Sequence, residues 1–158
     1  MVAYSHLVGA LQNAKFGKLT AADRMKDAAE KKLDLLENIA DVGKLAEGAR
    51  SQVRAEAKKQ ATENNDSEDN VYLEYQVVFD DEPFEDLGVL EGSKDECIKQ
   101  IDEWKQGILE ELEIEEQKIQ MESDAANTDY TKFGSQEEAL KSLITQEVQD
   151  YHSYGYQQ

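Results

Sequence analysis

The stretch MKDAAEKKLDLLENIADVGKLAEGARSQV, residues 25–53, decides the fold of this 158-residue chain. One set of its positions recurs at alternating intervals of three and four residues: Met25, Ala28, Lys32, Leu35, Ile39, Val42, Ala46, Ala49 and Val53. That spacing puts them on one side of an α-helix and is typical of the seam of a coiled coil or helical bundle. Leu33, Leu36 and Leu45 widen this face. Because TAAD at residues 20–23 resembles a capping box, we expect the helix to begin there and to run to about residue 62.

The residues before this helix favour a short amphipathic helix rather than a signal peptide. MVAYSHLVGALQNAK, residues 1–15, lacks a basic leading region, and polar residues interrupt its apolar ones. We therefore expect no cleavable signal, no membrane span, and a location in the cytoplasm or within a virion or extracellular assembly. Cys97 is the only cysteine, which excludes an intrachain disulfide.

A small β insert is expected after a polar linker at residues 63–70. In VYLEYQVVF, residues 71–79, the alternate residues Val71, Leu73, Tyr75, Val77 and Phe79 are apolar and share one face of a strand. The segment DDEP at 80–83 would turn the chain, and LGVL at 87–90 is the candidate second strand. An isolated hairpin is marginal in water, so it must pack on the helices or pair with a neighbouring chain.

The remainder of the chain, residues 93–158, is expected to be helical again. SKDE at 93–96 is a capping box that opens a helix to about residue 122, with an apolar stripe at Cys97, Ile101, Trp104, Ile108, Leu112 and Ile119. AANTD at 125–129 should break the helix, and SQEE at 135–138 should start a last one that carries Leu140, Ile144, Val148 and Tyr151. The predicted fold is therefore mainly α: a hairpin or bundle of long amphipathic helices with a small β insert. As one structural unit it divides into a basic arm at 1–62, an acidic linker at 63–70, the β insert at 71–92 and an acidic helical region at 93–158.

Charge is distributed unevenly along the chain. The net charge is −18, but residues 1–60 carry 11 Lys/Arg and 8 Asp/Glu, whereas residues 61–158 carry 6 and 27. Such acidity disfavours nucleic-acid binding, because phosphate contacts need a cationic surface. Leu, Ile, Val and Phe make up only 34 residues. So few large apolar residues favour a two-layer packing of helices with a small core, or a core that another subunit completes.

No motif for catalysis, cofactor binding or metal binding stands out. His6 and His152 lie near opposite ends of the sequence, and neither is spaced with a carboxylate as a helical ligand pair. The acidic cluster at 66–69 lacks the glycine and the terminal glutamate of a calcium-binding loop, and the cluster at 80–86 has Glu85 where such a loop has its glycine. We therefore expect no enzyme activity, no cofactor and no bound metal.

Two hypotheses of function follow from these patterns. The first is a structural or assembly subunit that binds itself or other protein subunits, and the order of helix, β insert and helix is similar in outline to filament subunits of flagella and type III secretion and to small helical virion proteins. Its expected interface residues are Met25, Leu35, Ile39, Val42, Val53, Val71, Leu73, Tyr75, Val77, Phe79, Trp104, Leu140, Ile144, Val148 and Tyr151. The alternative is an acidic binding protein, acting as a chaperone or a DNA-mimicking inhibitor, that docks a basic partner on the glutamates of residues 110–116.

Overall fold

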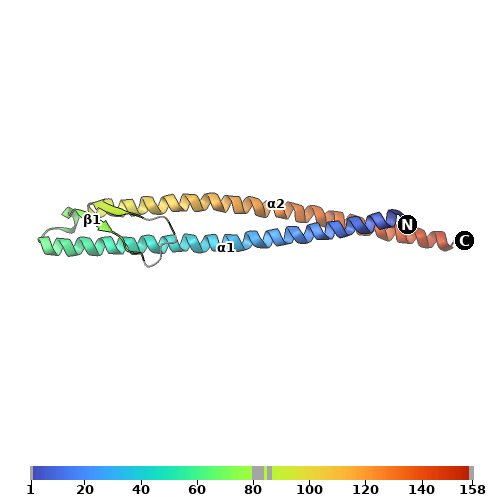
Figure 1. Cartoon of the computed structure of the whole chain (residues 1–158), viewed down its shortest axis with the longest axis horizontal. Helices are drawn as coiled ribbons and strands as arrows, with labels where there is room; N and C mark the ends of the chain where they lie inside the picture. Colours follow the sequence, from blue (N-terminus) through green and yellow to red (C-terminus); the bar gives the residue numbers. More distant parts are fainter. Residues whose placement is uncertain (1, 80–83, 85–86, 157–158) are drawn as a thin grey trace. The chain divides into compact units, whose positions relative to one another are not determined.

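Two long helices joined through a small sheet form this protein. The computed structural model describes residues 2–79, 84 and 87–156, and Figure 1 shows the order of its elements. They are helix α1 (Val2–Asn64), the 3-10 turn η1 (Glu68–Asn70), strands β1 (Leu73–Gln76) and β2 (Val89–Gly92), and helix α2 (Lys94–Tyr156). The two helices pack against each other, which confirms the expected fold class of a helical hairpin with a β insert. The expected turn at residues 80–83 lies outside the described residues.

Both helices are longer than the sequence predicts. The start expected at residue 20, the break at 125–129 and the new start at 135 are wrong, because all three lie inside continuous helix. Capping residues favour a helix end but do not break a helix by themselves, and these segments contain no proline or pair of adjacent glycines that would break it. Thr128 instead donates its hydroxyl to the carbonyl of Asp124 at 2.9 Å, and Ala126 is fully buried. Burial of Ala126 thus stabilises the helical conformation of residues 125–129, whose own helix propensity is low.

The structure comprises two compact units, which we describe separately. Unit 1 combines residues 1–32 with residues 117–158, and unit 2 is residues 33–116. Unit 2 therefore contains the sheet, the end of α1 and the beginning of α2, whereas the described residues of unit 1 are all helical.

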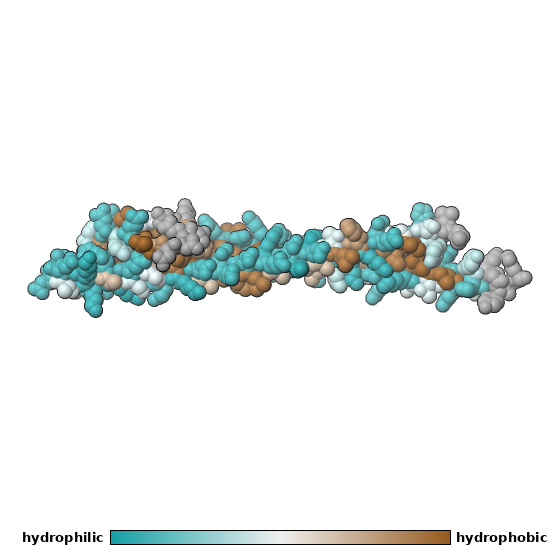
Figure 2. Space-filling view, turned by 60° about the horizontal axis from the view of Figure 1, so that its bottom comes forward, coloured by the Kyte–Doolittle hydropathy of each residue, from teal (hydrophilic) through white to brown (hydrophobic). Residues whose placement is uncertain are grey.

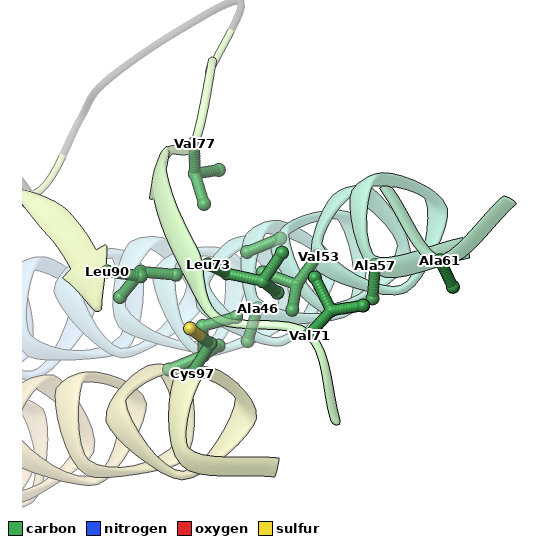
Figure 3. Close-up of a cluster of buried hydrophobic side chains, with 11 residues drawn as sticks. Ala46, Val53, Ala57, Ala61, Val71, Leu73, Val77, Leu90 and Cys97 are labelled. Atoms are coloured by element: carbon green, nitrogen blue, oxygen red, sulfur yellow. The ribbon is translucent and has the colours of Figure 1, made fainter. Parts of the chain in front are cut away.

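The core of unit 2 is the sheet packed on both helices. β1 and β2 are antiparallel, with Leu73 opposite Gly92 and Tyr75 opposite Leu90. As expected from the alternation, Val71, Leu73 and Val77 are buried while Glu74 and Gln76 are exposed. Tyr75, predicted on the same face as the valines, is only partly buried. Figure 3 shows these side chains against residues of α1 such as Val53, with Cys97 of α2 beside them. The hairpin is thus stabilised by its own chain's helices.

Local signals set where each helix of unit 2 ends. Asn65, with φ of 51°, follows α1, and the amide of Asp66 donates to the carbonyl of Ala61 at 2.9 Å, as in a Schellman motif. At the start of α2 the predicted capping box is confirmed: the amide of Glu96 donates to Ser93 Oγ and the amide of Ser93 donates to Glu96 Oε2, both at 3.2 Å.

A side-chain amide ties the sheet to α1. Gln52 Nε2 donates to the carbonyl of Val78 at 2.8 Å, and the amide of Val78 donates to Gln52 Oε1 at 3.0 Å. The Tyr75 hydroxyl donates to the same oxygen at 3.2 Å. One glutamine therefore satisfies the backbone groups that follow β1, as a neighbouring strand would.

Unit 1 is a pair of antiparallel helices with a thin seam. Between residues 4 and 32 of its α1 segment, the buried residues are Ala14, Ala21 and Ala28, at intervals of seven. Ion pairs cross between its helices in antiparallel register: Lys18 with Glu137 at 3.4 Å, Arg24 with Asp129 at 2.6 Å, and Lys31 with Glu122 at 3.2 Å.

Candidate interaction surfaces

The expected interface residues divide into buried and exposed groups. Leu35, Val42, Val53, Val71, Leu73 and Val77 are buried within unit 2, and Ile39, Tyr75, Phe79 and Trp104 are partly buried there. In unit 1, Met25, Leu140 and Ile144 are partly buried, while Val148 and Tyr151 are exposed. In unit 2 the chain's own helices and sheet therefore close most of the seam. Leu33 and Leu36, which widen the seam in the sequence, are exposed instead.

Unit 1 buries little apolar volume for its size. Among residues 4–32 and 117–153, where burial is described, its buried residues are Ala14, Ala21, Ala28, Ile119 and Ala126, four alanines and one isoleucine. Its exposed large apolar residues are Tyr4, Phe16, Leu19, Met121, Tyr130, Leu143, Val148 and Tyr151. Figure 2 shows apolar surface of this unit, in brown, toward the chain ends. Small residues contribute little burial energy, so the alanines stabilise unit 1 only weakly, and the exposed large side chains remain in contact with water.

An uncharged hollow lies between the two helices of unit 1. Its volume is about 460 Å³, and we name it the Ala14 hollow after its buried residue. The lining residues are Ala10, Asn13, Ala14, Phe133, Gln136, Ala139 and Leu140. None of them carries a charge, although one third of the chain's residues do. Next to it the Phe133 ring packs so closely on Gly17 that a Cβ there would lie 2.7 Å from the ring.

A second hollow of unit 1 has a charged border. Leu19, Ala22 and Tyr130 line it together with Lys15, Lys18 and Glu137. Lys18 Nζ lies 5.3 Å from the centre of the Tyr130 ring, and Lys141 contacts Glu137 at 2.9 Å. The hydrogen bond from Lys141, with a smaller contribution from Lys18, holds the pKa of Glu137 below its ordinary value. A further hollow of about 270 Å³ is lined by Tyr4, Glu147, Val148, Tyr151 and His152.

The acidity of the chain belongs almost entirely to unit 2. Residues 33–116 hold 8 Lys/Arg and 25 Asp/Glu, a net charge of −17, whereas residues 1–32 and 117–158 together hold 9 and 10, a net charge of −1. Within the described part of the chain, the glutamates at 110–116 take part in no ion pair. Arg50 pairs instead with Asp102, and Lys94 with Glu68 and Asp69. The glutamate face is therefore solvated or available to a foreign cation.

The side chains that could do chemistry are dispersed. Among residues 2–79, 84 and 87–156, no three His, Cys, Asp or Glu side chains gather as a metal site. The five acidic residues at 80–86 lie outside this range. Cys97 is fully buried, and burial, with a smaller contribution from Glu96, raises the pKa of its thiol. A raised pKa makes this thiol a poor nucleophile.

Three features of these surfaces escaped the sequence analysis. They are the Gln52 amide, the contact of Gly17 with Phe133 and the Ala14 hollow. One signal pointed toward the hollow: residues 1–14 contain no charged side chain.

None of the described helices is long and apolar enough to cross a membrane. No protein family, curated protein or solved structure was found to match this chain.

Proposed function

We propose that this protein is a non-enzymatic assembly subunit and that unit 1 is the part that associates with other protein subunits. The observation that carries the proposal is the composition of the described part of unit 1: five buried residues, four of them alanine, beside eight exposed large apolar side chains. Full burial of one large apolar side chain is worth about 1.5–3 kcal/mol. Covering several of these partly exposed side chains would therefore add stability to unit 1.

Unit 2 provides the contrast that supports this assignment. Its core contains large side chains, namely Leu73, Leu90 and Ile101, each almost completely buried. It also holds the sheet and the capping box that fix the connection of the two helices. In the proposed assembly, unit 2 folds on its own residues, and unit 1 is completed by what binds to it.

Site-specific photo-crosslinking in the cells that make the protein tests this proposal. A photoreactive residue is placed at Leu19 or Leu143 in unit 1, and at Leu36 in unit 2 as the matched control, since all three are exposed side chains of long helices. We expect higher-mass products from positions 19 and 143 and none from position 36. Products from position 36 alone, or from none of the three, would refute the assignment.

The unpaired glutamates of residues 110–116 favour a second candidate function, that of an acidic binding protein. Like charges at these spacings repel by a few tenths of a kcal/mol per pair, and a basic partner would relieve that repulsion. The double substitution Glu113→Gln and Glu116→Gln should weaken binding of a lysine-rich peptide at 50 mM salt. Asp34→Asn with Glu37→Gln, which removes the same charge from unit 2, is the control. Equal loss in both pairs would show attraction by net charge alone.

A further inference from the structure

We propose that a second copy of this chain covers the Ala14 hollow, and that Leu143 of each copy is inserted into the hollow of the other. This inference rests on the proposed function, because it names the partner of the unit 1 surface. It has three supports: the hollow is uncharged, an exposed leucine of the same chain borders it, and the charge of unit 2 leaves unit 1 as the place where copies can meet.

The absence of charge around the hollow determines the kind of partner. Its lining of alanine, leucine, phenylalanine and two neutral amides offers no ionic contact. A basic or acidic partner would leave its own charges unpaired there, which is costly in a covered interface. An apolar side chain can fill the hollow without that cost. The partner must therefore present an apolar side chain to the hollow, and unit 1 itself exposes such side chains.

Leu143 is the apolar side chain best placed to fill the hollow. It lies seven residues after Gln136 and three after Leu140, both of which line the hollow, so it continues the same side of α2. Its side chain is 48% exposed. A surface with a hollow and an adjacent protruding leucine is self-complementary under a two-fold axis, because each copy then supplies both halves of the contact twice.

Electrostatics restrict contacts between copies to unit 1. Two copies of unit 2, each with a net charge of −17, repel each other wherever they come within the screening length of about 8 Å at physiological salt. Unit 1 has a net charge of −1 and pays no such repulsion. We therefore expect self-association that strengthens slightly with salt, whereas contact with a basic partner would weaken.

Sedimentation velocity and light scattering on the purified full-length chain test the inference. We expect a mass of twice 17.9 kDa for the native protein at concentrations of 10–500 μM. Leu143→Glu puts a carboxylate into both contacts of the dimer and should raise its dissociation constant at least about 100-fold, about tenfold for each contact. Ala139→Lys, which charges the border of the hollow without removing a large side chain, should act in the same direction.

Leu36→Glu is the matched control, because Leu36 is 51% exposed, is also helical and lies in unit 2. It should leave the dimer intact, and circular dichroism should show the same helix content in all variants. A native chain that stays monomeric at 500 μM overturns the inference, as does a dimer that survives Leu143→Glu or dissociates with Leu36→Glu. A monomer that floats with neutral phosphatidylcholine vesicles would assign the hollow to lipid instead. A monomer that still crosslinks through position 143 in cells would refute only the second copy, and the assembly role would stand.

Discussion

Among the described glycines of unit 2, Gly92 is the one whose substitution by alanine should reduce the stability of the unit most. Its φ is 121°, a region that residues with a side chain rarely adopt, and a Cβ there would overlap the carboxylate of Glu96 and lie 3.0 Å from its Cβ. Gly92→Ala should add about 1–3 kcal/mol of backbone strain. Displacing Glu96 from the capping box adds about 0.5–2 kcal/mol. We expect a total loss of about 1.5–5 kcal/mol, a substantial fraction of the ~5–15 kcal/mol typical of a folded domain.

Urea unfolding, monitored by tryptophan fluorescence, measures this loss of stability in unit 2. Trp104 is the only tryptophan, and its ring stacks on Phe79 of unit 2 with centroids 5.7 Å apart. Gly88→Ala is the matched control, because Gly88 also has a positive φ of 74° but no described atom lies within 4 Å of a Cβ built there. It should cost only about 1–2 kcal/mol.

A double-mutant cycle separates the strain from the collision. If the contact with Glu96 contributes, Gly92→Ala should cost less in a chain that already carries Glu96→Ala than in the native chain. The reasoning is refuted if Gly92→Ala is no more destabilising than Gly88→Ala, or if its cost is the same with and without the Glu96 side chain.

Three further perturbations test other contacts of unit 2, each by the same urea titration. Gln52→Leu removes both hydrogen bonds to Val78 and should destabilise by about 1–2 kcal/mol rather than more, since water can replace them at this partly exposed site; an unchanged midpoint would contradict the role of the amide. Glu74→Lys should stabilise by up to about 1 kcal/mol at low salt, because Glu74 lies directly opposite Glu91 in the sheet; a loss of stability would show that the two carboxylates do not interact. Because the pKa of Cys97 is raised in the folded protein, its thiol ionises at lower pH in the unfolded chain, and stability should fall as pH rises above about 8.5. Cys97→Ala should abolish this dependence on pH. Equally rapid thiol labelling of native and unfolded protein would argue against the burial of Cys97.

The sequence predicted those parts of the fold that depend on local pattern. The capping box at Ser93 and most of the seam of residues 25–53 are local signals that appear where expected. Of the expected strand at 71–79, only Leu73–Gln76 is a strand, although Val71, Leu73 and Val77 are buried as the alternation predicts. The same reasoning failed at residues 125–129 and 135, where weak breaking residues are overruled by the packing of Ala126 against the other helix. Local preference loses to tertiary contact at such positions.

The candidate surfaces were less accessible to sequence reasoning. Gln52 looks like any polar residue on a helix, and its contact with Val78 spans 26 positions, which no periodicity reveals. The Ala14 hollow likewise combines residues more than a hundred positions apart in sequence. The expected interface at Leu140, Ile144, Val148 and Tyr151 stays a prediction, now located beside the surface that the crosslinking experiment addresses.

The two hydrogen bonds between the Gln52 side chain and the backbone of Val78 also bear on solubility. A two-stranded sheet offers unsatisfied amides and carbonyls along its borders, and such borders recruit strands from other molecules into aggregates. Because the carboxamide of Gln52 already occupies both backbone groups of Val78, an incoming strand would find that position filled and would have to displace the helix to pair there. A single polar side chain thus blocks strand pairing at the position two residues beyond the end of β1.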